Sequence, residues 1–304
     1  MTGRPMTGGA MTGGPMTGVA DAVTWLFVPG HRADRFAKAA AAGADVVIFD
    51  LQDAVPAEQK AEARVAVAQA LASGALAAGA LAAGATGCVR INPVTGAEGQ
   101  ADLEALHGVL AGAASAEFSV MLPLAESAAD LDRIQAHLPG IAVVALIESA
   151  RGWGAARELS AHPAVARLAF GNLDTAADLG CSPDSPTLDQ VRMALVLESR
   201  LAGLPGPVDG VTPEFRDPTV AAADASHAKR LGLAGKLCIH PVQLAPVAGA
   251  FVPTEAEISW AGEIERGLAA AGGGAFAVDG AMVDAPVIAR ARRILRSVEG
   301  GRRR

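Results

Sequence analysis

The sequence predicts an α/β protein built as a (β/α)8 TIM barrel with a C-terminal helical extension. Strand and helix patterns alternate eight times over about 230 residues from residue 24, close to the usual barrel length of roughly 250 residues. The strand candidates are continuous apolar runs, typical of a parallel sheet that is buried on both faces. No glycine-rich nucleotide-binding motif follows the first strand, which disfavours the alternative of an open doubly wound sheet.

The predicted strands are short apolar runs, most of them rich in β-branched residues. They cover residues 24–28, 45–50, 87–91, 118–122, 142–147, 167–170, 208–211 and 236–239. The segments between them are amphipathic or alanine-rich, which predicts helices packed outside the barrel. These helices cover residues 32–42, 57–72, 100–112, 127–137, 151–160, 187–203, 218–231 and 242–249.

The 304-residue chain divides around this barrel into three predicted parts. Residues 1–20 repeat Met-Thr-Gly with Gly or Pro and lack the apolar core of a signal peptide, so we expect a disordered tail. Residues 21–250 form the predicted catalytic barrel, and residues 251–304 form the helical extension. A second low-complexity stretch, residues 73–87, extends a helix end and a loop.

The composition of the chain argues against two classes of partner. A net charge of −7 disfavours a nucleic-acid-binding surface. No run of roughly 18 or more apolar residues lacks glycine or charge, so no membrane span is predicted. The three cysteines, Cys88, Cys181 and Cys238, have no metal-ligand spacing and indicate a reduced, cytoplasmic protein.

Charged side chains stand at the carboxyl ends of several predicted strands, where TIM barrels carry their chemistry. They are Asp50 and Asp53 at the second strand, Arg90 at the third, Glu148 at the fifth and Asp174 after the sixth. Carboxylates this close repel one another, which predicts a bound cation. Oxygen ligands favour Mg2+, with Mn2+ as a substitute, and we expect Glu148 and Asp174 to hold it. The alternative is structural, with the same residues as helix caps and salt bridges.

Six motifs carry a family resemblance in their order and spacing. They are LFVPGHRADRFAKAAAAGADVVIFDLQDAV (26–55), VRINP (89–93), LIES (146–149), FGNLDTAADLG (170–180), GKLCIHPVQL (235–244) and DGAMVDAP (279–286). From about residue 24 to 297 the chain resembles the HpcH/HpaI aldolase/citrate lyase family. It is most similar to the citrate lyase β-subunit-like branch, which includes malyl-CoA and citramalyl-CoA lyases. The resemblance implies a TIM barrel, a Mg2+-dependent carbon–carbon lyase of CoA thioesters and commonly a homotrimer.

The resemblance also implies roles for individual residues. Glu148 and Asp174 resemble the metal ligands, and Arg90 resembles the arginine that grips the keto-acid carboxylate. Asp284 resembles the acid/base aspartate, which relatives deliver across a subunit boundary; Asp279 is its competitor. The positions that contact substrate or CoA are Phe27, Arg32, Lys38, Arg90 and Glu148, and those that hold metal-bound waters are Asp50, Gln52 and Asp53.

Four positions depart from the family pattern. Gln52 and Leu173 replace glutamates, and Leu124 and Ala281 replace lysines. Gln52 keeps its hydrogen-bonding capacity but loses a negative charge, and Leu124 removes a positive one. Because these two losses offset each other, we expect an intact metal site, while the four departures leave the choice of substrate open.

These residues predict the retro-Claisen cleavage of a 3-hydroxyacyl-CoA thioester. The substrate would resemble malyl-, citramalyl- or citryl-CoA, and the products would be a 2-keto acid and acetyl-CoA or a homologue. A malyl-CoA thioesterase and a malate-synthase-like condensing enzyme are variants of the same enolate chemistry. A different class is a partner-dependent or non-catalytic citrate lyase β-like subunit. The match at Asp284 favours a stand-alone CoA enzyme.

Overall fold

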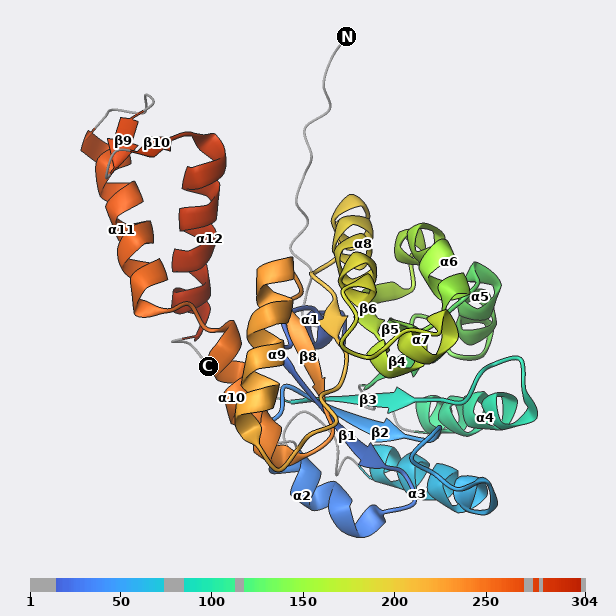
Figure 1. The fold of residues 1–304 in the computed structure, drawn as a ribbon. Helices are drawn as coiled ribbons and strands as arrows, with labels where there is room; N and C mark the ends of the chain where they lie inside the picture. The colour runs from blue at the N-terminus through green and yellow to red at the C-terminus, as the bar shows by residue number, and fades with distance from the viewer. Residues whose placement is uncertain (1–14, 74–84, 113–117, 271–275, 279–280, 302–304) are drawn as a thin grey trace. The chain divides into compact units, whose positions relative to one another are not determined.

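The computed structural model of the chain describes residues 15–73, 85–112, 118–270, 276–278 and 281–301 (Figure 1). The chain divides into two compact units, Met1–Val247 and Ala248–Arg304. This division and the predicted one at residues 250–251 both fall within helix α10 (Leu244–Phe251). Among the described residues, no helix combines the length and the apolar character that a membrane crossing needs.

Eight parallel strands close into a barrel in sequence order, with β1 paired to β8, which confirms the predicted fold. Every residue of β2, β4, β5 and β6 is buried, as expected of strands covered on both faces. The strands are β1 (Thr24–Pro29), β2 (Val46–Asp50), β3 (Thr86–Arg90), β4 (Phe118–Leu122), β5 (Val143–Ile147), β6 (Val165–Phe170), β7 (Val208–Asp209) and β8 (Gly235–Cys238).

Helices follow the strands around the barrel, and local sequence sets several of their starts (Figure 1). Ser127 and Ser149 cap α5 and α6 by accepting backbone N–H bonds, and Asp217 does the same for α9. Short helix α7 (Asn172–Leu179) is absent from the predicted helices. The other helices of the barrel unit are α1 (Pro15–Ala20), α2 (Phe36–Ala40), α3 (Lys60–Ala72), α4 (Ala97–Gly112), α5 (Ala128–His137), α6 (Ala150–Ala161), α8 (Thr187–Leu201) and α9 (Pro218–Leu231).

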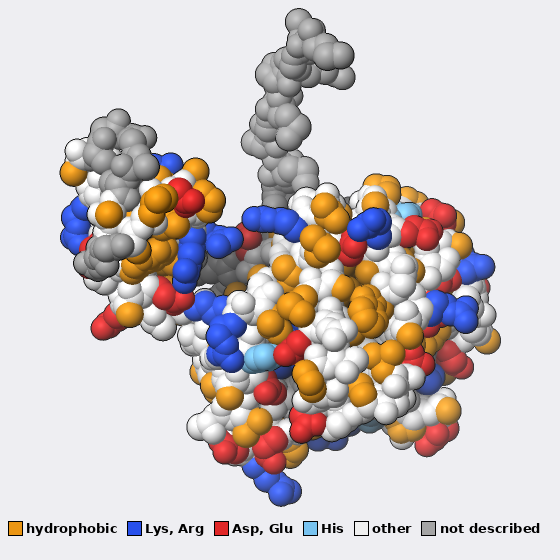
Figure 2. Space-filling model, turned by 45° about the horizontal axis from the view of Figure 1, so that its top comes forward, with side chains coloured by type: hydrophobic (Ala, Val, Ile, Leu, Met, Phe, Trp, Pro, Cys, Tyr) orange, Lys and Arg blue, Asp and Glu red, His pale blue; other side chains and the backbone are white. Residues whose placement is uncertain are grey.

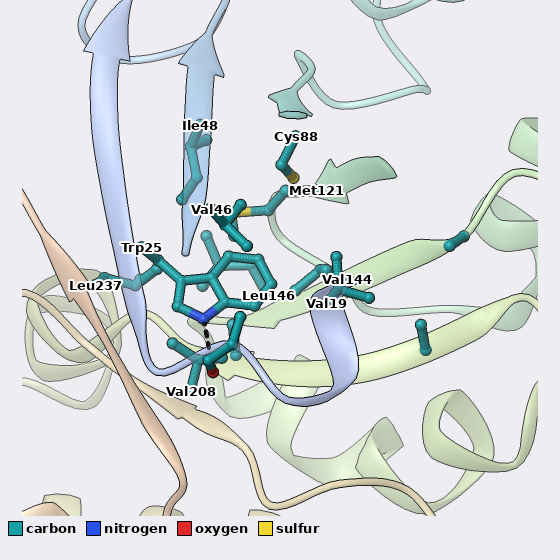
Figure 3. Packing of buried hydrophobic residues seen from close by; sticks show 14 residues of the cluster. Val19, Trp25, Val46, Ile48, Cys88, Met121, Val144, Leu146, Val208 and Leu237 are labelled. Carbon is teal, nitrogen blue, oxygen red and sulfur yellow. Dashed lines mark hydrogen bonds between the residues drawn. The ribbon is translucent and has the colours of Figure 1, made fainter. Parts of the chain in front are cut away.

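The structure differs from the predicted tail over its last six residues, which form α1. Val19 is fully buried in the barrel core with Trp25, whose indole N–H donates to the carbonyl of Ala22 at 3.3 Å (Figure 3). Arg167 donates to the carbonyls of Val19 and Ala22 at 2.9 and 2.6 Å. Burial of Val19 and these bonds outweigh the low-complexity composition here. Residues 1–14 of the predicted tail and residues 74–84 of the second low-complexity stretch lie outside the described residues.

The second unit is a helical pair with a small hairpin. Helices α11 (Glu255–Ala270) and α12 (Ala285–Gly301) pack around a cluster that includes Ala261, Ile264 and Ala291. Strands β9 (Phe276–Val278) and β10 (Ala281–Val283) pair antiparallel between them. On the face of the barrel unit in Figure 2, acidic and basic side chains are interspersed among apolar and uncharged ones.

Candidate functional site

The barrel brings the carboxyl ends of its strands to one rim, and the predicted charged residues lie there. Asp50 ends β2 and is paired in register with Arg90, which ends β3. Glu148 directly follows β5. Asp174 is exposed in the first turn of α7, where the helix dipole favours a carboxylate. The position of Asp174 therefore depends on a helix that sequence periodicity alone does not reveal.

One edge of the Arg90 guanidinium group pairs with the Asp50 carboxylate. Its Nε and Nη2 atoms donate to the two carboxylate oxygens at 2.8 and 2.7 Å, a bidentate pair. Nη1 lies 3.5 Å from Asp53. Asp50 also accepts hydrogen bonds from the backbone N–H groups of Gln52 and Ala54, at 2.9 and 3.0 Å. The pair fixes the guanidinium plane and leaves the Nη1 side of Arg90 for a second anion.

Glu148 is a buried carboxyl group with only 3 % of the residue exposed. Its Oε1 accepts the backbone N–H of Leu124 at 2.7 Å. Its pKa is raised from 4.5 to about 7, chiefly by burial; the Leu124 N–H and Arg90 act to lower this pKa, and Asp174 and Asp53 act to raise it. The structure thus brings Glu148, Asp174, Asp53 and Arg90 into one electrostatic environment. A cation placed there would favour the ionised carboxylate of Glu148.

A polar network that the sequence analysis missed supports the loops after β2 and β3. Lys60 donates to the carbonyls of Leu51 and Gln52 at 2.9 Å each, and to Asn92 Oδ1 at 2.8 Å. Asn92 in turn donates to fully buried Asp102 at 2.7 Å. Asn92 also donates to the carbonyl of Leu51 at 2.9 Å, across 41 positions of sequence, and contacts this distant cannot be predicted from residue type alone.

The predicted substrate-contact residues separate into two groups. Phe27 lies under Arg90, with the guanidinium carbon 4.7 Å from the ring centroid. Phe27 and Lys38 line one pocket of about 560 Å³, together with Asp34, Arg35, His240 and apolar side chains. Arg32 instead forms a bidentate pair with exposed Asp34, at 2.8 and 2.7 Å. The structure therefore brings Phe27 and Lys38 together and commits Arg32 to a surface ion pair.

Asp284 belongs to the second unit, where it precedes α12. Its Oδ1 accepts the backbone N–H of Val287 at 3.3 Å, a helix-capping contact. Ala281, at one of the departures from the family pattern, is the first residue of β10. Asp279, the competing acid/base residue, lies outside the described residues.

The donor set at the rim fits a hard cation that keeps part of its water shell. All candidate ligands are carboxylate oxygens, which favour Mg2+. Gln52 Oε1 and His31 Nδ1 are buried without a hydrogen-bond partner within the described part of the chain, so the rim has polar atoms to spare for water or ligand. Among the same residues, no group of three or more His, Cys, Asp or Glu side chains could hold a metal. The fit therefore rests on two carboxylates completed by waters and substrate oxygens.

A known protein family matches most of the barrel unit. The model for HpcH/HpaI aldolase/citrate lyase matches residues 24–241. The chain is similar to a crystal structure of CitE from Mycobacterium tuberculosis in complex with magnesium, acetoacetate and coenzyme A. The TM-score is 0.77 with 36% sequence identity, covering 92% of this chain and 99% of that one.

Two curated relatives differ in their named reactions. The (3S)-malyl-CoA thioesterase of Cereibacter sphaeroides (strain ATCC 17029) is 32% identical over 283 residues, covering 90% of this chain and 93% of the relative. The mitochondrial citramalyl-CoA lyase of Rattus norvegicus is 30% identical over 294 residues, covering 89% and 84%. Both names refer to CoA thioesters, but they describe the cleavage of different bonds.

Proposed function

We propose, because the chain belongs to the HpcH/HpaI aldolase/citrate lyase family, that it is a Mg2+-dependent carbon–carbon lyase. Its substrate would be a 3-hydroxyacyl-CoA thioester such as malyl-, citramalyl- or citryl-CoA. The products would be a 2-keto acid and acetyl-CoA or a homologue. The observation that carries this proposal is the buried Glu148 carboxyl group beside Asp174 and Arg90 at the catalytic end of the barrel.

Glu148 and Asp174 would hold the magnesium ion, with Asp50, Gln52 and Asp53 binding its water ligands. When bound, Mg2+ supplies Lewis-acid stabilisation of the substrate oxygens. The Leu124 N–H keeps one oxygen of Glu148 in place. The choice of magnesium is supported by the structure of a related protein in complex with magnesium, acetoacetate and coenzyme A.

Arg90 would bind the substrate carboxylate that becomes part of the keto acid. A guanidinium carries five N–H donors, and Asp50 accepts from one on Nε and one on Nη2. The remaining donors on Nη1 and Nη2 can grip a carboxylate end-on. In cleavage, the hydroxyl proton passes to a base, the C2–C3 bond breaks, and its electron pair forms the thioester enolate. Asp284 would then protonate the enolate carbon.

The pocket beside Phe27 supports a CoA site. Lys38 and Arg35 supply two positive charges against the one negative charge of Asp34, which suits phosphate groups, and the apolar side chains suit the rest of the CoA molecule. Because Phe27 also lies under Arg90, this pocket adjoins the proposed carboxylate site. Arg32 would reach CoA only after giving up its pair with Asp34.

Replacing Asp284 with asparagine tests the acid/base assignment. We expect kcat to fall by about 10²- to 10⁴-fold with little change in KM, because a positioned proton donor contributes on that order. Asparagine also caps helices well, so the variant should fold normally. Asp279→Asn is the matched comparison, measured by the same steady-state assay. A large loss for Asp279→Asn with normal turnover for Asp284→Asn would move the role to Asp279.

The metal-free protein should lose stability as the pH rises. The pKa of Glu148 is about 7 in the folded protein against an ordinary value of 4.5. Its stabilising contribution is therefore complete below pH 4.5 and lost as the pH rises through 7, about 3 kcal/mol in total. Urea unfolding in EDTA at acidic and mildly alkaline pH should show this loss relative to Glu148→Gln. A pH-independent difference between the two proteins would contradict the burial of an ionisable Glu148.

Product analysis distinguishes the proposed lyase from its alternatives. Purified protein with Mg2+ is incubated separately with malyl-CoA, citramalyl-CoA and citryl-CoA. A lyase releases a 2-keto acid and a shorter acyl-CoA, whereas a thioesterase, the reaction named for one relative, releases free CoA and a hydroxy acid. A condensing enzyme consumes a 2-keto acid and acetyl-CoA. No reaction with any of them would favour a partner-dependent or non-catalytic subunit.

A further inference from the structure

Leu124 has a backbone conformation that leucine rarely adopts. Its φ is +44°, and among the described residues it is the one non-glycine residue with positive φ. The left-handed region is unfavourable for a bulky L-residue and persists where the surroundings impose it. The residue is 41% exposed, so burial of its side chain does not account for the conformation.

Two hydrogen bonds to the end of β5 hold the backbone at Leu124. Its own N–H donates to Glu148 Oε1 at 2.7 Å. The N–H of Ala125 donates to the carbonyl of Leu146 at 3.1 Å. The N–H groups of two consecutive residues thus donate to the end of β5, one to a carboxylate and one to a backbone carbonyl. The conformation of Leu124 is the means by which a backbone donor points at Glu148.

Gly171 packs closely against Glu148. A Cβ atom at this position would lie 2.4 Å from Glu148 Cβ and 2.6 Å from Oε2, distances that no side chain tolerates. Gly171 is tied to β5, because its N–H donates to the carbonyl of Ile147 at 2.8 Å. Its own carbonyl accepts the N–H of Thr175 at 3.0 Å, in the first turn of α7. Glycine here therefore allows Glu148 to lie against the start of the helix that carries Asp174.

We propose that Leu124 and Gly171 are positioning residues that fix the carboxylate of Glu148 for the cation, an inference that rests on the proposed metal site. The backbone N–H of Leu124 donates a hydrogen bond to Oε1 of Glu148. Gly171 provides the space for Oε2 beside α7. The two together set the orientation in which Oε2, rather than Oε1, is presented to the cation alongside Asp174.

A substitution series at Leu124 tests the role of its backbone. Mg2+ affinity is measured by calorimetry on the full chain without substrate. Leu124→Gly and Leu124→Asn tolerate the left-handed conformation, and we expect them to retain the wild-type affinity. Leu124→Val disfavours it, and we expect a loss of about 10- to 100-fold, the range for residues that orient a ligand. Equal affinity across the series, or a loss that follows side-chain size, would overturn the proposal.

Gly171→Ala provides an independent test that does not depend on the folding of the valine variant. Its added methyl group must displace Glu148, so we expect an affinity loss of at least about tenfold. Gly154→Ala is the control, because a Cβ there meets no atom within 4 Å. Unchanged affinity in Gly171→Ala would contradict the proposal. If the wild-type protein itself binds no Mg2+, the proposed metal site fails; if only the variants disagree, the positioning role alone fails.

Discussion

Asp174→Ala is expected to remove magnesium binding and to lower turnover by about three orders of magnitude. A metal that stabilises developing charge supplies several kcal/mol, and each 1.4 kcal/mol is worth about tenfold in rate. Because Asp174 is exposed, its loss should leave the metal-free fold intact. Calorimetry measures Mg2+ binding, thermal unfolding with and without Mg2+ measures stability, and a steady-state assay measures turnover. At a free Mg2+ concentration 100-fold above Kd, the free energy of unfolding of the wild-type protein should rise by about 2.7 kcal/mol, and that of the variant should not change.

Asp178→Ala is the matched control for this prediction. Asp178 lies one turn further along α7, where its carboxylate accepts the backbone N–H of Ala150 at 2.7 Å. It is the same residue type on the same helix, yet it is engaged at the start of α6. We expect Asp178→Ala to retain the stabilisation by Mg2+. Equal loss in both variants would indicate a general effect on α7 instead of a ligand at Asp174.

Arg90→Ala should be destabilising as well as inactive. Its partner Asp50 is 1 % exposed and would lose both guanidinium bonds. Removing one member of a buried ion pair costs about 3–5 kcal/mol, because the other charge stays buried without its partner. Arg90→Lys keeps the positive charge but cannot form the bidentate pair with Asp50. We therefore expect a smaller loss of stability than in Arg90→Ala, together with a raised KM. Urea unfolding and steady-state kinetics separate the two effects.

An exposed ion pair offers the control for Arg90. Arg133 lies 2.6 Å from Asp130 on α5, with 48% of its side chain exposed. Surface pairs of this kind contribute about 0.2–1 kcal/mol, so Arg133→Ala should change stability little and kinetics not at all. Comparable losses at Arg90 and Arg133 would contradict the buried, site-forming role of Arg90.

Sequence periodicity was sufficient to predict the barrel, and strand order was sufficient to predict the composition of its rim. The fold follows from eight apolar runs that alternate with helical patterns, and the rim follows because parallel strands share a carboxyl edge. Helix α7 has only eight residues, of which Asn172, Thr175 and Ala176 are buried, so no apolar stripe marks it. Residues 15–20 resemble a tail by composition, but the burial of Val19 is a tertiary effect.

Contacts within the rim could not be predicted because they depend on register and backbone geometry. Asp50 and Arg90 are 40 positions apart and meet only through the pairing of β2 with β3. Arg32 meets its nearest anion, Asp34, two residues away, which competes with the role that the family resemblance implies. The left-handed conformation of Leu124 could not be predicted from the sequence, because this conformation is usually indicated by glycine or asparagine and the residue here is leucine.

The most direct test of the central claim is the release of a 2-keto acid from malyl-CoA, citramalyl-CoA or citryl-CoA before and after removal of Mg2+ with EDTA. We predict that at least one thioester is cleaved by the wild-type protein, that EDTA stops the cleavage, and that added Mg2+ restores it. The turnover of Asp174→Ala should stay about three orders of magnitude below that of the wild-type protein at every Mg2+ concentration. Cleavage that continues unchanged in EDTA, or that proceeds at the wild-type rate in Asp174→Ala, would contradict a catalytic magnesium held by Glu148 and Asp174.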